Sequence, residues 1–251
     1  MQEYWDRRIR ESRGSLEGVL WARLPIWNDH VDKVQMHHLQ PVLEQVKPHH
    51  SVLDVGCGVG RLTFRLARLS KETWGIDTST MAIRTCEEIS KSSGISNAHF
   101  ADMDVRDLQF DNDTFDWVFS ITALQCLTTR RDLTLGISEI LRVTKKGGTI
   151  VLLESTTDRR KDPYNISLSR NEWFQIIEDS GGRIQSWHGV DVAILRNLAF
   201  RFLGLAEMVG KNVGRRFAEY AMASLLRPVE CSVPRILRNA SWYSLILVVK
   251  K

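Results

Sequence analysis

The amino-acid sequence is most informative at Val52-Leu53-Asp54-Val55-Gly56-Cys57-Gly58-Val59-Gly60, an apolar run that ends in alternating glycines. The run Ser51–Val55 predicts a buried strand, and apolar residues recur at helical spacing over Arg61–Leu69. Glycines between the two allow a sharp turn and a close approach of a ligand to the backbone. A strand, a glycine turn and a helix in this order predict the first half of a βαβ unit.

The glycine turn and the strand after it indicate a nucleotide-like ligand. A turn that opens a helix presents free backbone N–H groups. A dinucleotide fingerprint would carry a small residue at position 61, where this chain has Arg61, so a nicotinamide cofactor is disfavoured. Asp77 follows the second strand, and its carboxylate could accept two hydrogen bonds from a ribose diol. The alternative is a helix N-cap, a role that Thr78 or Ser79 could fill instead.

The rest of the chain repeats the alternation of strand and helix, which predicts a mainly parallel sheet covered on both faces. The apolar spacing over 28–47 predicts a helical region, with Pro41 starting a fresh helix. Lys145-Lys146-Gly147-Gly148 is expected to stop the helix before it. The further expected elements are strands at Thr73–Ile76, His99–Ala101, Asp116–Ser120, Thr149–Leu153, Arg183–Trp187 and Trp242–Val249, and helices at Ser79–Ser93, Leu133–Val143 and Arg170–Ser180.

Size and composition are those of a globular protein of 251 residues, 43% hydrophobic and 25% charged. No stretch approaches the roughly 20 apolar residues that a membrane-spanning helix needs, and no apolar run follows the first charges. We therefore expect a cytoplasmic protein. The cysteines form no CxxC pair and no acidic cluster suits magnesium, so neither a disulfide framework nor a metal site is expected.

The positive charge is concentrated near the C-terminus. Between Arg196 and Arg238 the chain carries eight Lys or Arg residues and three acids, against a net charge of +4 for the whole chain. Apolar residues recur there at steps of three or four, which predicts a helical insertion before the last strand. The insertion could be a lid over a pocket, a basic surface that contacts anionic lipid, or a helical pair packed on the sheet edge.

With these motifs in order, the chain from about Ser51 to Glu154 resembles the class I S-adenosylmethionine-dependent methyltransferases of the small-molecule type. The resemblance implies a Rossmann-like α/β fold: a seven-stranded, mainly parallel sheet with helices on both faces and the last strand antiparallel beside the sixth. A single methyltransferase domain would comprise a helical cap (1–47), a core (48–195), a helical insertion or lid (196–240) and the last strand (241–251).

The resemblance also implies where S-adenosylmethionine would bind. Asp54 and the glycine turn would hold the methionine part, Asp77 the ribose, and Asp104, preferred to Asp102, the adenine amino group. The N-terminal aromatics Tyr4 and Trp5 would cover the cofactor or simply pack. The expected cofactor-binding residues are Tyr4, Asp54, Gly56, Cys57, Gly58, Gly60, Asp77, Thr78, Met81, Met103, Asp104, Val105, Ser120, Ile121 and Gln125.

The acceptor is the open part of the hypothesis. Relatives often have a histidine where this chain has Cys126, so the candidates for a base are only His37, His38, Glu154 and His188. We expect methyl transfer to a hydroxyl or amine of a small molecule: a sugar, a lipid-like compound or a secondary metabolite. The alternatives are a protein or RNA methyltransferase docking through 196–238, and a non-catalytic adenosylmethionine-binding protein. A nucleic-acid acceptor is disfavoured, because the fourth strand lacks an Asn/Asp-Pro-Pro-aromatic run.

Overall fold

The computed structural model describes residues 2–11, 25–158, 164–191, 224–232 and 241–250. Its centre is one seven-stranded sheet in the order β3-β2-β1-β4-β5-β7-β6. All neighbours pair in parallel except β7, which is antiparallel to both β5 and β6. The strands are β1 (Ser51–Val55), β2 (Glu72–Asp77), β3 (Ala98–Asp102), β4 (Phe115–Ile121), β5 (Thr144–Ser155), β6 (Gly182–Gly189) and β7 (Tyr243–Lys250). The predicted Rossmann-like architecture with an antiparallel last strand is confirmed.

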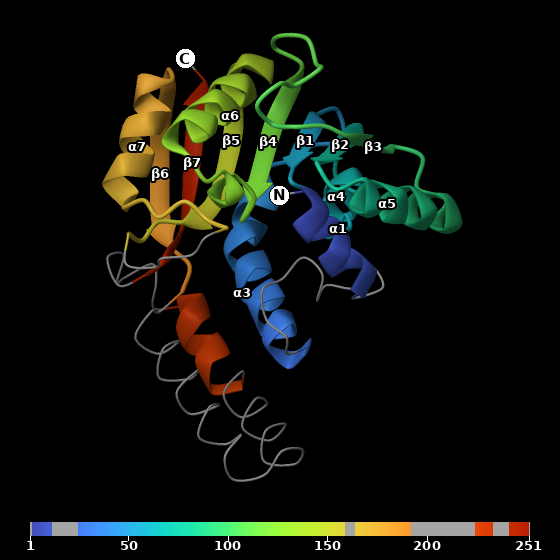
Figure 1. Cartoon of the computed structure of the whole chain (residues 1–251), viewed down its shortest axis with the longest axis horizontal. Helices are drawn as coiled ribbons and strands as arrows, with labels where there is room; N and C mark the ends of the chain where they lie inside the picture. The colour runs from blue at the N-terminus through green and yellow to red at the C-terminus, as the bar shows by residue number, and fades with distance from the viewer. Residues whose placement is uncertain (1, 12–24, 159–163, 192–223, 233–240, 251) are drawn as a thin grey trace.

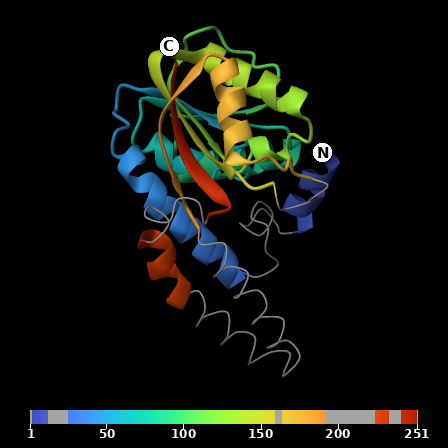
Figure 2. The same cartoon turned by 90° about the vertical axis from the view of Figure 1, so that its left-hand side faces the viewer.

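Helices cover both faces of this sheet (Figures 1 and 2). On one face, α6 and α7 bury Ile140 and Trp173 against the apolar strands; on the other, α3 and α4 bury Leu39 and Leu66. The helices are α1 (Gln2–Glu11), α3 (Pro25–Leu43), α4 (Thr63–Ala67), α5 (Thr80–Ser93), the short 3-10 helix η1 (Leu124–Cys126), α6 (Arg130–Val143) and α7 (Arg170–Asp179). Helices α3, α4, α6 and α7 lie on the sheet because their apolar residues are buried there, whereas α1 packs against α5.

One sequence prediction about a helix boundary is wrong and another is confirmed. Pro41 does not start a fresh helix but lies inside α3. Proline there costs a single hydrogen bond near the helix end, and the buried stripe of Val34, Leu39 and Val42 keeps the helix continuous. The helix before Lys145–Gly148 does end there, at Val143. The segment itself belongs to β5, where the pairing with β4 shifts between Phe115 and Trp117.

Most of the predicted insertion lies outside the described residues. Its described part, residues 224–232, is helical and lies beside α3 in both views (Figures 1 and 2). There Arg227 pairs with Asp29 at 3.3 Å and Glu230 with His30 at 2.6 Å. Within the described parts of the chain, no helix is long and apolar enough to cross a membrane.

Candidate active site

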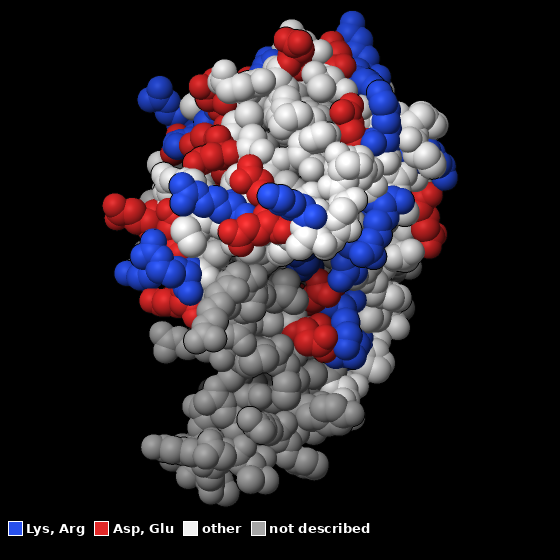
Figure 3. All heavy atoms as spheres, turned by 90° about the vertical axis from the view of Figure 1, so that its right-hand side faces the viewer, with Lys and Arg blue, Asp and Glu red and all other residues white. Residues whose placement is uncertain are grey.

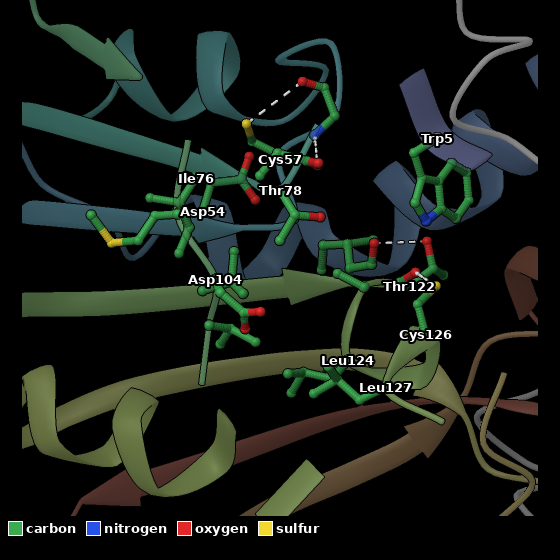
Figure 4. Close-up of a pocket in the computed structure, with 18 of the residues that line it drawn as sticks. Trp5, Asp54, Cys57, Ile76, Thr78, Asp104, Thr122, Leu124, Cys126 and Leu127 are labelled. Carbon is green, nitrogen blue, oxygen red and sulfur yellow. Dashed lines mark hydrogen bonds between the residues drawn. The ribbon is translucent and has the colours of Figure 1, made fainter. Parts of the chain in front are cut away.

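A cavity of about 240 Å³ opens at the carboxyl ends of the parallel strands, between β1 and β4. Open α/β sheets bind ligands at this edge. Where the connections after two neighbouring strands run to opposite faces of the sheet, they leave a crevice between them. The volume has room for a ligand rather than a few waters, each of which occupies about 30 Å³ in the liquid. Figure 4 shows side chains from four strand ends converging on it, with Trp5 of α1 at its side.

The turn after β1 forms the floor of the cavity. Gly56, Gly58 and Gly60 have φ values of 68°, 53° and 79°, in the left-handed region that favours glycine. A side chain at Gly56 would overlap the Cβ of Ala123 in the loop after β4. The expectation of free N–H groups is wrong for this turn: Gly56 and Cys57 donate to the Ile76 carbonyl, and Gly58 donates to Asp77 at 2.9 Å. The turn is held by the strand beside it.

Asp77 at the end of β2 lines the cavity and also shapes it. Its two carboxylate oxygens accept from the N–H groups of Gly58 and Ser79, both at 2.9 Å. Burial raises the pKa of Asp77, and the two N–H donors oppose that rise. A carboxylate has about four lone-pair sites, so two remain for a diol. The N-cap role belongs to Ser79, whose hydroxyl accepts from Ala82.

Asp54, the last acid before the turn, lies in the cavity floor with 3% of its surface exposed. It accepts a 2.6 Å hydrogen bond from the Thr63 hydroxyl. Burial raises the pKa of Asp54 to about 7, the Thr63 hydrogen bond opposing the shift. Asp54 can therefore exist as a neutral acid or as an anion near neutral pH.

The segment after β3 forms the opposite end of the cavity. Asp104 lines it, and the hydrogen bond from Arg106, 2.6 Å from Nη2 to Oδ2, lowers the pKa of Asp104. Arg106 also reaches Asp132 at the start of α6, at 3.1 Å. Asp102 does not line the cavity and instead accepts from Thr80 at 2.6 Å. The apolar lining beside Asp104 consists of Ile76, Met103, Val105, Leu124 and Leu127.

The loop after β4 forms a wall of the cavity, but not with all the residues that the sequence suggested. Ile121 lines the cavity, whereas Ser120 and Gln125 are buried and contact Glu154. Thr122 and Cys126 line it instead. Nothing in the sequence marks Thr122, which follows β4 directly and has a positive φ of 59°.

Helix α1 covers the side of the cavity with Trp5 rather than Tyr4. Tyr4 stacks on Tyr164 with ring centroids 4.4 Å apart, and Asp6 accepts from the Ser79 hydroxyl at 2.5 Å. The prediction that Tyr4 lines the site is therefore wrong, although its neighbour does.

Two further expected residues pack beneath the site. Gly60 does not line the cavity; it lies against Phe64 and Cys86, which leave no room for a side chain. Met81 packs with Ile9 and Val59 and does not line it either.

None of the four candidate bases lines the cavity, and one of them, Glu154, is fully buried. His38 Nε2 donates to the Glu230 carbonyl at 2.8 Å, and His38 Nδ1 lies 3.2 Å from His188 Nε2. The His37 ring contacts the His38 ring edge-on at 5.5 Å. Glu154 is 0% exposed and accepts its hydrogen bonds from protein groups. The structure therefore does not place any of these four at the cavity wall.

Arg61 was missed as a site residue. It lines the cavity and donates to Asp32 at 2.6 Å and to Gln35 at 2.8 Å, which ties the glycine turn to α3. Its position directly after Gly60 was a usable signal, because the first residue after such a turn stays close to it. Arg106 and Asp132 also line the cavity, and their pairing could not be read from the sequence.

The fold and the site together define a Rossmann-like protein with a ligand-sized cavity at the carboxyl edge of its sheet. A family model described as "Methyltransferase domain" matches residues 46–187. The chain belongs to this family, the class I S-adenosylmethionine-dependent methyltransferases. The residues fit the cofactor, because one carboxylate ends β2, another follows β3, and an apolar lining lies between them.

Relatives by sequence are methyltransferases. Demethylmenaquinone methyltransferase of Bacillus subtilis is 28% identical over 168 residues, 66% of this chain and 70% of that protein. Ajmaline N-methyltransferase of Rauvolfia serpentina is 29% identical over 143 residues, 56% of this chain but only 47% of that protein. For several of these relatives the chain thus spans about half of their length.

Solved structures share the fold at low identity. The cyclase SpnF superposes with a TM-score of 0.65 at 19% identity, over 99% of this chain and 94% of that one. Geranyl diphosphate C-methyltransferase from Streptomyces coelicolor, solved with S-adenosyl-L-homocysteine, gives a TM-score of 0.61 at 16% identity, over 86% and 77%.

Proposed function

We propose that this protein transfers the methyl group of S-adenosylmethionine to a hydroxyl or amine of a small, largely apolar molecule. The observation that carries the proposal is the pair of carboxylates, Asp77 and Asp104, which line the same cavity with an apolar lining between them. Relatives whose names specify small acceptors support the size of the acceptor: a demethylmenaquinone, an alkaloid, a phytyl hydroquinone and a sterol. Of these names, the alkaloid enzyme's specifies a nitrogen and the sterol enzyme's specifies a carbon.

When bound, the cofactor supplies a methyl group on a sulfonium, which needs alignment more than activation. Alignment of two reactants can lower a barrier by about 7–11 kcal/mol. Asp77 binds and orients the cofactor through its two remaining lone pairs, and the glycine turn fixes the position of that carboxylate. Trp5 shields the side of the cavity from water.

The loop after β4 is the wall nearest to where an acceptor would enter. The side chains that this loop presents to the cavity are the hydroxyl of Thr122, the methyl of Ala123 and the thiol of Cys126. None of the three is a carboxylate or an imidazole that could serve as an ordinary base. This wall suits an acceptor that is itself apolar. Among the described cavity residues there is no histidine, so we assign no base.

Figure 3 bears on the alternative acceptors. On the face that it shows, basic and acidic side chains are interspersed, which is not the basic stripe of a nucleic-acid surface. The basic segment that could dock a protein or RNA lies mostly outside the described residues.

The test begins with calorimetric titration of the protein with S-adenosylmethionine, S-adenosylhomocysteine and NAD. We expect micromolar binding of the two adenosyl compounds and none of NAD. Asp77→Ala should lose affinity for the adenosyl compounds. Asp116→Asn is its matched control, because Asp116 lies at the other end of β4 and pairs with Lys145 outside the cavity. Release of S-adenosylhomocysteine is then measured with a demethylated naphthoquinol, a tertiary-alkaloid precursor and a sugar. Binding of NAD alone, or of neither adenosyl compound, contradicts the proposal.

A further inference from the structure

Glu154 lies next to the end of β5, is 0% exposed, and has no role in the reaction described above. Its Oε1 accepts from the Ser120 hydroxyl at 2.8 Å and from the N–H groups of Ala123 and Leu124 at 3.3 and 3.1 Å. Its Oε2 accepts from the Gln125 N–H at 3.1 Å. A carboxylate without a proton is acceptor-only, so the side chain is matched to these donors. One buried acid therefore holds consecutive backbone groups of the loop after β4.

The loop that Glu154 holds is strained. Thr122 has a φ of 59°, a region that is unfavourable for a β-branched residue. Such a conformation persists only where the surroundings enforce it. Here the Thr122 N–H donates to the Leu153 carbonyl at 2.7 Å, and Gln125 accepts from the Ser155 N–H at 2.8 Å. Three consecutive residues of β5, with Glu154 in the middle, thus fix the loop.

The loop in turn sets the width of one part of the cavity. Ala123 lies against Gly56 so closely that no side chain fits between them. A movement of the loop would therefore act most directly on the wall beside the glycine turn, where Ala123 lies. It would act less directly on the end with Asp104, to which the loop contributes Leu124. The family resemblance assigns the methionine part of the cofactor to the glycine turn.

We propose that Glu154 is a positioning residue that holds the loop of residues 121–126 in place for the methionine part of the cofactor. This proposal rests on the proposed function, because it concerns the same cavity. Exchange of the carboxylate for an amide would place an N–H₂ group against backbone N–H donors and so release at least one of the loop contacts. Burial raises the pKa of Glu154 to about 7, so the experiments belong at pH 8, where the acid is ionised.

The test compares Glu154→Gln with the wild type by calorimetry, with S-adenosylhomocysteine and 5′-methylthioadenosine as probes. The second probe lacks the amino-acid part. We expect the affinity for S-adenosylhomocysteine to fall about tenfold and that for methylthioadenosine to fall less, by about threefold at most. Hydrogen exchange supplies a second readout: the amides of Ala123, Leu124 and Gln125 should exchange at least about tenfold faster, while those of β1 stay protected.

The matched control is Asp191→Asn. Asp191 is also a buried acid that follows a strand, and it accepts from the N–H groups of Trp242 and Tyr243, but it does not line the cavity. Its exchange should leave both affinities unchanged. If Glu154→Gln does not fold, Ser120→Ala can replace it, because it removes one of the contacts to Glu154. It should lower the affinity for S-adenosylhomocysteine more than that for methylthioadenosine, by a smaller factor than Glu154→Gln.

The outcomes separate the two proposals. Equal losses for both probes, or unchanged exchange of the three amides, would overturn the positioning role while the wild type still binds S-adenosylhomocysteine. A wild type that binds neither probe would instead overturn the proposed function on which this role depends.

Discussion

The exchange of Gly56 for alanine should destabilise the protein through a contact as well as through backbone strain. Gly56 has a φ of 68°, and its added Cβ would overlap Ala123, far inside the 3.0 Å limit of real Cβ contacts. Gly94, at the end of α5, has almost the same φ of 67° but nothing within 4 Å of an added Cβ. Comparing the two glycines separates the cost of backbone strain from the cost of the steric contact, since alanine at Gly56 incurs both and alanine at Gly94 only the strain.

The expected magnitudes follow from these surroundings. The left-handed backbone should cost Gly94→Ala about 1–2 kcal/mol of unfolding free energy. Gly56→Ala should cost about 1–3 kcal/mol more, because inserting a methyl group into a packed contact displaces the loop. Ala123→Gly removes the opposing methyl group, so the double variant should recover most of that extra cost.

The assay is urea unfolding at pH 7 of the wild type, the three single variants and the Gly56→Ala/Ala123→Gly double variant. The cycle should give a favourable coupling energy of about 1–3 kcal/mol between positions 56 and 123. The reasoning is refuted if Gly56→Ala costs no more than Gly94→Ala, or if the two positions are additive to within about 0.5 kcal/mol.

Three further predictions concern the rest of the site. Asp77→Ala should weaken binding of S-adenosylhomocysteine by about 1–3 kcal/mol, measured by calorimetry, because a hydrogen-bonded carboxylate is lost; unchanged affinity would contradict the ribose assignment. The unfolding free energy should fall as pH rises from about 5 to 7, since folding raises the pKa of Asp54 to about 7 and its protonated form is the one that the folded state favours. Asp54→Asn should reduce that slope by up to about 1.4 kcal/mol per pH unit, and an equal slope in urea titrations would count against burial as the cause. A double-mutant cycle of Tyr4→Ala and Tyr164→Ala should give a coupling of about 0.5–1.5 kcal/mol in thermal unfolding, and additivity would show that the stack contributes nothing.

The sequence predicted what depends on local pattern. The glycine turn after β1, Asp77 after β2 and Asp104 after β3 are each read from a few neighbouring residues. Because parallel strands end at one edge of a sheet, knowledge of the strands was enough to bring these groups to one cavity. The confirmed mainly parallel sheet follows from the same alternation of apolar strands and amphipathic helices, whereas the order of its strands was not predicted.

Prediction failed where the direction of a single side chain mattered. Ser120 and Ile121 are neighbours in a strand and must point to opposite sides, so only Ile121 reaches the cavity. Tyr4 and Trp5 are neighbours in a helix, about 100° apart around its axis, and Trp5 is the one that lines the cavity. Which side of a strand or helix faces the cavity depends on what that strand or helix packs against.

By itself, then, the sequence determined the family, the fold and the acids at the strand ends, since these depend on short-range patterns and on the rules of parallel sheets. Only the tertiary structure decided that Glu154 binds the loop after β4 instead of serving as a base, and that Arg61 joins Asp32. It also paired His38 with His188, 150 positions apart in the chain. Such contacts join residues that are distant in the chain, and no local pattern specifies which distant side chain will satisfy a buried polar group.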